Sequence, residues 1–451
     1  MNCRAILSWF FGIVFFFSTG LCLAGEDRFI VGDSSPAVAK TWAAGDVRVT
    51  DPTINEVKPS MTSAPNGDLW VAVEEVAANW IRLYRSTDGG DTWAWVVAFS
   101  SGDDSRNPSV AYGEHSNGEK WVYVAYEQVT TAGDNRSVRV YRWDVVGASG
   151  TWITVDGPFI MNGTSDEVHP QITTDYVEWG DLYFVYLTYA KFAIDYYPVY
   201  SARTADRGAN WSTPLNVTGG SENTAWATRP EIAFGFSGLF ITFVKPGWNG
   251  TTWSNQIWLT QSTDFGLSFS TPVQLTDSTA NQFHPSVAAA HGTDALVIAF
   301  TFDWGSDTDV FFTSSTDGGT TWSTPNTLPW TFDHESSVDL VASPRSGGYF
   351  HAAYKHELTG GGSNYIWYTQ ASTANPSAWS VNRQINDVAF ASATYPRPTI
   401  AVMPDLPSAG EAAIAWTDYR GAFYDAYFDT AAIFADGFES GDTSAWSSSV
   451  P

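Results

Sequence analysis

The chain has 451 residues, with 22 lysines and arginines against 48 aspartates and glutamates, so its formal net charge is −26 at pH 7. This acid excess argues against nucleic acid or an anionic membrane surface as a partner. The length is enough for one large domain with its own core. Both cysteines, Cys3 and Cys22, lie in the first 24 residues, so the remainder of the chain has no disulfide.

Residues 1–24 have the pattern of a secretory signal peptide. Arg4 supplies the positive start, residues 6–17 are apolar, and Cys22-Leu23-Ala24 is a small-residue cleavage site before Gly25. The apolar run is too short for a membrane span, and none of comparable length follows it. We therefore expect an exported protein, secreted or periplasmic, without a membrane span.

A short marker then recurs along the chain: one residue, a proline and a short alternating strand. The prolines are Pro59, Pro108, Pro170, Pro230, Pro285 and Pro398. The last interval is about two periods long, and Ser336-Ser337-Val338-Asp339 fills its middle without a proline. Each marker is followed by an apolar second strand, a third strand and a fourth. Seven units of four antiparallel strands predict an all-β fold, a single seven-bladed β-propeller, with six blades as the alternative.

The two ends of the repeat array predict how the ring closes. Residues 42–51 resemble residues 269–277, the outer strand of the fourth unit, whereas the seventh unit has room for only three strands. We expect a strand at residues 47–50 to complete the last blade and so remove an open sheet edge. The propeller domain then covers residues 25–430. Residues 431–451 form a tail rich in glycine, serine and acids, outside the ring.

One octet with a tight turn recurs where third strands end. It is Ser315-Thr316-Asp317-Gly318-Gly319-Thr320-Thr321-Trp322, with a close copy at residues 86–93 and looser copies at 204–211 and 262–269. Glycine allows the positive φ angles of the turn, and each aspartate can accept backbone N–H groups. We expect Asp88, Asp206, Asp264 and Asp317 to be structural rather than catalytic. Most of the 22 tryptophans also fall at repeat positions, which favours blade packing over sugar stacking.

The residues before the prolines are the most informative irregularity. They should gather at one mouth of the central channel, because every marker strand begins at the same rim. In an acidic chain these positions carry several cations and imidazoles, and the candidate ligand-binding residues are Lys58, Arg106 (beside Asn107), His169, Arg229, His284 and Arg397. Guanidinium groups bind carboxylates bidentately, which favours an anion or sugar-acid site. The alternative is that these side chains pair with neighbouring carboxylates and hold the blades together.

The ends of the second strands should reach the same rim. They carry Glu75, Glu127, Tyr189, Lys245, Asp303, His356 and Asp418. Asp303, Asp307 and Asp309 form an oxygen-rich loop of a kind that can bind Ca²⁺. A hairpin loop with solvated acids is the commoner outcome, so the Ca²⁺ site is the less favoured interpretation and no cofactor is certain.

The octets resemble the Asp-box (bacterial neuraminidase, or BNR) repeat, S/T-x-D-x-G-x-T-W/F, of sialidase-like β-propellers. The resemblance implies carbohydrate binding, and in the exo-sialidases of this family it implies three arginines for the substrate carboxylate, a Tyr–Glu nucleophile pair and an Asp acid/base. Their Arg-Ile-Pro motif is matched here only by Arg106-Asn107-Pro108. Tyr189 is a candidate nucleophile, and Asp103 or Asp104 a candidate acid.

The sequence therefore predicts an exported, monomeric Asp-box propeller that binds a carbohydrate or other anionic ligand at its channel mouth. An exo-sialidase-type glycoside hydrolase is the alternative. Whether the chain is catalytic, which ligand it binds and what the tail does are left open.

Overall fold

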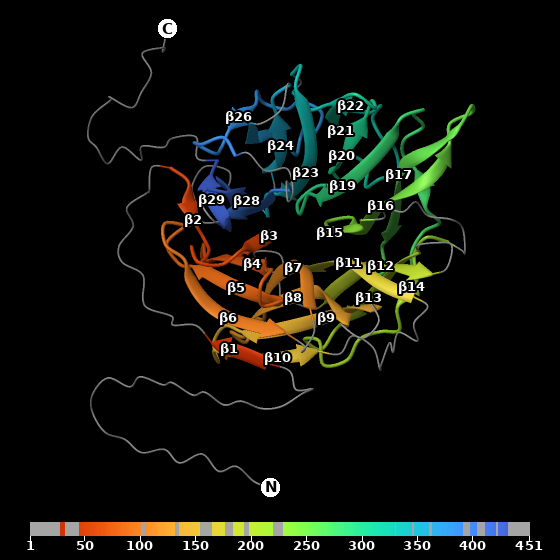
Figure 1. Ribbon diagram of the computed structural model, residues 1–451. Helices are drawn as coiled ribbons and strands as arrows, with labels where there is room; N and C mark the ends of the chain where they lie inside the picture. Colours follow the sequence, from red (N-terminus) through yellow and green to blue (C-terminus); the bar gives the residue numbers. More distant parts are fainter. Residues whose placement is uncertain are drawn as a thin grey trace, which may run out of the picture.

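The computed structural model describes residues 28–31, 45–100, 104–130, 135–153, 165–175, 184–193, 198–219, 229–329, 331–344, 347–359, 363–390, 397–403, 411–420 and 423–431. All regular elements within these ranges are β-strands, and they form seven antiparallel sheets arranged in a ring (Figure 1). The prediction of a seven-bladed propeller is confirmed, and the six-bladed alternative is wrong. No helix in the described ranges is long and apolar enough to span a membrane.

Each blade runs from an inner strand to an outer strand in chain order. The inner strands are β3 (Glu56–Ser63), β7 (Asp104–Glu114), β11 (Ser165–Thr174), β15 (Glu231–Gly235), β19 (Asn281–Ala289), β23 (His334–Ala342) and β27 (Thr399–Met403). The second strands are β4 (Leu69–Glu75), β8 (Lys120–Thr130), β12 (Val185–Ala193), β16 (Gly238–Trp248), β20 (Leu296–Asp303), β24 (Tyr349–Glu357) and β28 (Glu411–Tyr419). The blades are numbered 1 to 7 in this order.

The outer halves of the blades are shorter. The third strands are β5 (Trp80–Ser86), β9 (Asn135–Asp144), β13 (Val199–Thr204), β17 (Trp253–Ser262), β21 (Thr308–Ser315), β25 (Asn364–Ser372) and β29 (Tyr424–Thr430). The fourth strands of blades 1 to 6 are β6 (Ala94–Ser100), β10 (Ser149–Ile153), β14 (Leu215–Asn216), β18 (Val273–Gln274), β22 (Asn326–Thr327) and β26 (Arg383–Gln384).

The ring closes through the N-terminal segment, as the sequence predicts. Strand β2 (Val47–Arg48) pairs antiparallel with β29, so blade 7 has the order β2-β29-β28-β27. Strand β1 (Arg28–Val31), which the sequence did not predict, pairs with β6 and gives blade 1 a fifth strand. The proposed signal peptide and residues 432–451 of the proposed tail lie outside the described residues, whereas Ala431 is buried in the last blade.

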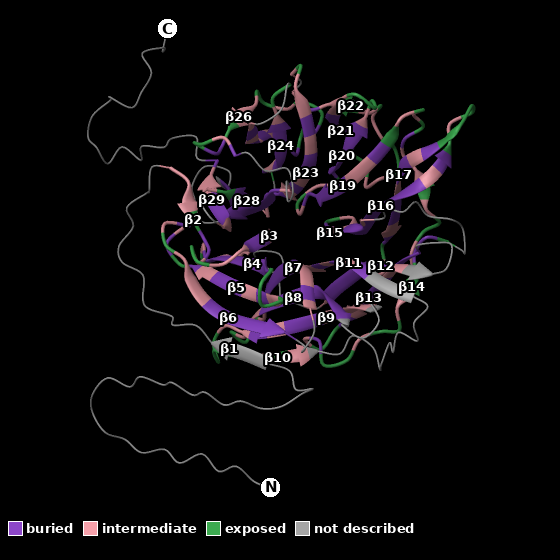
Figure 2. Ribbon diagram, viewed as in Figure 1, coloured by how far each residue is buried: buried purple, intermediate pink, exposed green. Residues whose placement is uncertain are grey.

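The core lies between neighbouring blades, and Figure 2 shows buried residues along the strands of the blades, whereas the exposed residues lie mostly in the loops and hairpin tips. Successive side chains of a strand point to opposite faces. In β4, Leu69 and Val71 therefore pack with blade 7, whereas Trp70 and Ala72 pack with blade 2. Because both faces are covered, the second strands read as continuous apolar runs.

Candidate functional site

The marker strands begin with an unusual backbone conformation. A residue before proline normally adopts an extended conformation, and a non-glycine residue with positive φ is uncommon. Five of the seven equivalent positions nevertheless have φ between 48° and 58°: Lys58, Asn107, His169, His284 and Ser337. The register of the inner and second strands shifts at the same five places. The repeat thus contains a bulge at the channel mouth that the sequence analysis missed.

Side chains of the preceding blade stabilise this bulge. The backbone N–H of Asn107 donates to Oε2 of Glu74 at 3.1 Å, and that of His169 donates to Oε1 of Glu127 at 2.7 Å. The N–H of Lys58 donates to Oγ1 of Thr417 at 3.0 Å. These second-strand side chains therefore hold neighbouring blades together. The expectation that second-strand ends also line the channel mouth is wrong for the described residues, because the inner strands lie in front of them.

A cavity of about 250 Å³ occupies the end of the channel where the marker strands begin, and we call it the polar mouth. Its lining consists of Lys58, Pro59, Ser60, Asn107, Pro108, His169, Pro170, Gln171, Arg229, Glu231, Asp339, Arg397, Pro398 and Thr399. Four of the six predicted ligand-binding residues belong to this set. A cavity of this size suits one small molecule or one terminal unit of a larger one.

Arg397 contacts the two carboxylates of the polar mouth. Its Nη2 lies 2.5 Å from Oε1 of Glu231 and 3.5 Å from Oδ1 of Asp339. Burial raises the pKa of Glu231 to about 7, although the charge of Arg397 acts in the opposite direction. Both carboxylates follow a proline-equivalent position, where the sequence analysis considered only the preceding residue. The sequence does contain a signal for them: the position directly after the proline or its equivalent carries serine, threonine or glutamine in the other units and an acid in these two.

Arg229 differs from the other cations of the polar mouth. The described part of the chain offers its guanidinium no hydrogen bond and no ion pair. Burial, followed by the nearby charge of Arg397, lowers the pKa of Arg229. Lys58, in contrast, pairs with Glu74 at 2.9 Å between Nζ and Oε2. As far as the described residues go, Arg229 is therefore the cation of the polar mouth with unused donors.

The two histidines do not add positive charge. Burial and then the charge of Arg229 lower the pKa of both His169 and His284 to about 3. His169 lines the polar mouth. His284 does not line it, but the charges of Arg229 and Arg397 still lower the pKa of His284. Their imidazoles are neutral near pH 7, so they can serve as hydrogen-bonding groups rather than as cations.

Arg106 does not join the polar mouth. Its Nη2 pairs with Asp104, and Asn107, one residue later, takes the lining position. Tyr189, the candidate nucleophile, is buried against Tyr200 with ring centroids 5.9 Å apart. Asp103 lies outside the described residues. The third arginine and the Tyr–Glu pair that the family resemblance implies are thus not assembled here among the described residues.

A Tyr–Glu pair does occur elsewhere. Tyr84 donates to Oε1 of Glu56 at 2.7 Å, and burial, which outweighs this bond, raises the pKa of Glu56 to about 7. However, Tyr84 packs in the apolar cluster between blades 7 and 1, and neither residue lines the polar mouth. We therefore assign the pair to blade packing.

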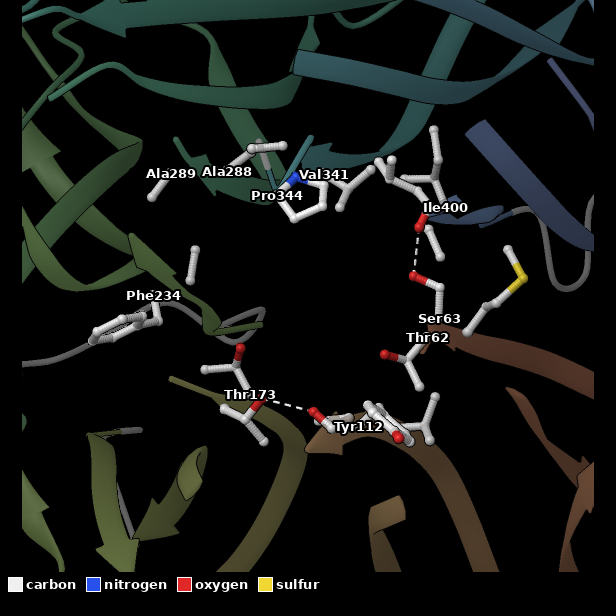
Figure 3. A pocket seen from close by; sticks show the side chains of 18 of the residues that line it. Thr62, Ser63, Tyr112, Thr173, Phe234, Ala288, Ala289, Val341, Pro344 and Ile400 are labelled. Carbon is white, nitrogen blue, oxygen red and sulfur yellow. Dashed lines mark hydrogen bonds between the residues drawn. The ribbon is translucent and has the colours of Figure 1, made fainter. Parts of the chain in front are cut away.

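The opposite end of the channel provides a comparison. Its cavity is also about 250 Å³ and is lined by the same inner strands, but His291 is its only charged or titratable side chain apart from Tyr112. Figure 3 shows small apolar and hydroxyl side chains, among them Thr62, Ala288, Val341 and Ile400, around an open centre. We call this end the apolar mouth. Charge is therefore not a requirement of the ring and is confined to one end.

The turns formed by the four octets lie at the same end of the ring as the apolar mouth. The N–H of Gly318 donates to the carbonyl of Asp294, in the turn between the inner and second strands of blade 5. All four boxes share one geometry, in which the aspartate accepts from the hydroxyl two residues earlier and from the N–H four residues later. Each octet therefore forms a hydrogen-bonded turn, and a structural rather than catalytic role for the four aspartates stays a prediction.

The three aspartates of the predicted Ca²⁺ site have other partners. Asp303 accepts from the N–H of Gly305, Asp307 contacts Nδ1 of His334, and Asp309 accepts from Nε1 of Trp304. The described residues contain no group of three or more side chains that could hold a metal ion. Asp309 is buried rather than solvated, so its hydrogen bond to Trp304 is part of the hairpin's packing.

The sequence matches no model of a known protein family and no curated protein. Several solved structures are similar in fold. An α-L-arabinanase of Penicillium chrysogenum is 15% identical with a TM-score of 0.49, covering 86% of this chain and 97% of its own. A GH93 α-L-arabinofuranosidase of Fusarium graminearum is 14% identical, with a TM-score of 0.48 and coverages of 86% and 97%. The NanB sialidase of Streptococcus pneumoniae is 11% identical, with a TM-score of 0.46 and coverages of 86% and 70%.

Proposed function

We propose that this chain is an exported, monomeric, sialidase-like propeller that binds a carboxylate-bearing ligand, such as a sugar acid, at its polar mouth. The observation that carries the proposal is Arg229, a guanidinium facing the cavity without a hydrogen-bonding partner among the described residues. Burying such a group is unfavourable unless a partner of opposite charge completes it. A ligand carboxylate supplies that partner bidentately.

The neighbouring groups suit the rest of such a ligand. Asn107 and His169 provide neutral hydrogen-bonding groups, and the Glu231 carboxyl offers an acceptor for a hydroxyl. The paired state of Lys58 and Arg397 means that they shape the cavity more than they neutralise the ligand. We therefore expect Arg229 to contribute most of the charge recognition.

Calorimetric titration of the mature chain with glucuronate and N-acetylneuraminate, with glucose as a neutral control, tests the proposal. A charged hydrogen bond contributes about 1.5–3 kcal/mol, so Arg229→Ala should weaken carboxylate binding about tenfold or more. Arg229→Lys should restore only part of it, because lysine lacks the planar fork. The exposed Arg48 provides a matched control of equal charge change. Equal affinities in wild type and Arg229→Ala would reject the site.

Glycoside hydrolysis is the second candidate. It is favoured by the Glu231–Arg397–Asp339 arrangement, because a carboxyl group with a pKa near 7 beside a second carboxylate can donate a proton to a leaving group. Incubation with fluorogenic sialosides and arabinofuranosides between pH 5 and 7 separates the candidates. Release of the fluorophore by wild type but not by Glu231→Gln would favour the enzyme.

A further inference from the structure

Three tryptophans are exposed on neighbouring hairpins at the end of the ring that carries the polar mouth. Trp248, Trp253 and Trp304 are 50%, 67% and 56% exposed. They lie where second strands end and third strands begin, in blades 4 and 5, so packing between blades does not account for them. Solvent-exposed aromatic rings gathered in this way are typical of interaction surfaces rather than of a core.

The three rings lie on the sides of blades 4 and 5 that face each other. Trp248 and Trp253 share a strand face with Val244 and Ile257, which belong to the same apolar cluster as Ile298 and Phe302 of blade 5. Trp304 lies against Phe302, with centroids 4.4 Å apart, and is therefore on the side of blade 5 that faces blade 4. The N–H of Asn255 donates to Oδ1 of Asn281 at 3.0 Å and joins the blades between them.

The rings are held in place before any ligand arrives. Trp248 and Trp253 are a directly opposed cross-strand pair with centroids 5.8 Å apart, closed by a turn in which Asn249 accepts the N–H groups of Thr251 and Thr252. Nε1 of Trp304 donates to Oδ2 of Asp309 at 2.7 Å. The polar edge of Trp304 is thus occupied while its face is exposed. Fixed aromatic faces lose little conformational entropy on binding.

We propose that Trp248, Trp253 and Trp304 form an aromatic platform that stacks the neutral sugar rings of a glycan chain. The electron-rich face of an indole attracts the polarised C–H groups on one side of a sugar ring. The amide of Asn281 and the carboxylate of Asp303, opposed to each other at the edge of the platform, suit the hydroxyls around that ring. An apolar protein partner would remove water from these polar groups and offer them no further hydrogen bonds.

The platform is continuous with the polar mouth through blade 4. Glu231 pairs with Thr242, and β16 continues six residues further to Trp248, which at 3.3 Å per residue is a rise of about 20 Å. The hairpin of β16 and β17 projects from the ring in Figure 1, and its tip is exposed in Figure 2. That separation calls for several sugar residues. A neutral chain also avoids repulsion by a protein of net charge −26.

An acidic sugar in the polar mouth and neutral sugars on the platform can belong to one glycan, and this arrangement rests on the proposed function. The platform itself can be tested independently of the polar mouth. Neutral hexasaccharides of β-1,4-glucan, β-1,4-xylan, β-1,4-mannan and α-1,5-arabinan are titrated into the mature chain. At least one should bind, and both Trp253→Ala and Trp304→Ala should weaken it fivefold or more. Trp253→Phe should retain part of the affinity because an aromatic face remains.

Two matched variants separate the two sites. Phe236→Ala removes an aromatic ring of similar exposure at the opposite rim and should change nothing. Arg229→Ala should leave neutral hexasaccharide binding intact but weaken acidic ligands. Unchanged unfolding midpoints of the tryptophan variants confirm that the exposed positions affect binding only. If neutral sugars bind and carboxylates do not, the proposed function fails and the platform stands.

The platform is rejected if none of the four hexasaccharides binds or if the tryptophan variants bind as wild type does. It is also rejected if wild type sediments as a dimer that Trp253→Ala dissociates, because a second copy of the chain would then cover the rings.

Discussion

The octet turn of blade 1, at residues 86–93, allows a direct test of whether the octets stabilise the fold. Asp88 is 4% exposed, and its Oδ1 accepts from Oγ of Ser86 at 2.7 Å and from the N–H of Thr92 at 3.0 Å. Burial alone would raise the pKa of Asp88, but the bonds from Thr92 and Ser86 outweigh it, so the pKa lies below its ordinary value. The carboxylate is therefore ionised and bonded near pH 7.

Asp88→Ala removes these acceptors at a buried position, where water does not replace the bonds that Asp88 receives from the hydroxyl of Ser86 and the N–H of Thr92. Such a loss costs about 1–3 kcal/mol of folding free energy. Asp317 makes the same contacts with Ser315 and Thr321 in blade 5, but it is exposed, so water can replace them after Asp317→Ala. The two variants are therefore matched in chemistry and differ in burial.

Urea unfolding of the two variants, followed by tryptophan fluorescence, measures the difference. We expect a clearly lower midpoint for Asp88→Ala than for Asp317→Ala, with carboxylate binding unchanged in both. Equal midpoints would refute the argument from burial. Lost binding at unchanged stability would refute the assignment of the boxes to a structural role.

Two further predictions concern charges away from the polar mouth. Burial, assisted by Asp309, raises the pKa of Glu335 to about 8, whereas the unfolded chain releases this proton near pH 4.3. The free energy of unfolding should therefore fall between about pH 5 and 8, and the urea midpoint of Glu335→Gln should exceed that of wild type by an amount that grows over this range. A difference in midpoint that does not depend on pH would contradict this prediction. Arg420 joins blade 7 to the N-terminal segment through Asp46 at 2.5 Å, so Arg420→Ala should lower the free energy of unfolding by about 1.5–3 kcal/mol, while Arg48→Ala at the exposed surface should stay within about 0.5 kcal/mol.

The architecture was predictable because it repeats. The spacing of the prolines predicts the number of blades, and the recurring octets predict where turns fall. The seventh unit has room for only three strands and therefore predicts a closing strand, which is β2. Strand β1 was not predictable in this way, because it adds a fifth strand to a blade that the repeat already completes. A repeat pattern predicts the strands that recur in every blade, but it cannot predict a strand that is added to one blade only.

The polar mouth was predictable only in part, for a reason of backbone geometry. The sequence places Arg106 one residue from the equivalent position, and alternation then turns it away while Asn107 lines the cavity. It also suggests cationic imidazoles, whereas burial keeps His169 and His284 neutral. Neither the positive φ angles nor the burial of a single side chain can be read from residue types at this spacing.

The inner strands of neighbouring blades are joined by hydrogen bonds from a backbone N–H to a side-chain oxygen. These bonds explain why the charges of the polar mouth point to function. The hydroxyls of Ser60 and Ser109 each accept an N–H from the next blade at 3.1 Å, and those of Ser286 and Thr399 do the same elsewhere in the ring. At the equivalent position of blade 6, Asp339 makes this bond with its Oδ2, so a carboxylate performs a task for which serine suffices.

Glu231 occupies the corresponding position in blade 4, where its burial is unfavourable enough to raise its pKa to about 7. Stability alone favours serine at both positions, because a buried carboxylate loses hydration that an ion pair only partly replaces. The unfavourable groups are gathered around Arg229 and Arg397 at one end of the channel, and the apolar mouth has no counterpart among its lining residues. Retention of destabilising charges at one end, in a ring that can be closed without them, is what selection for a ligand at that end would produce.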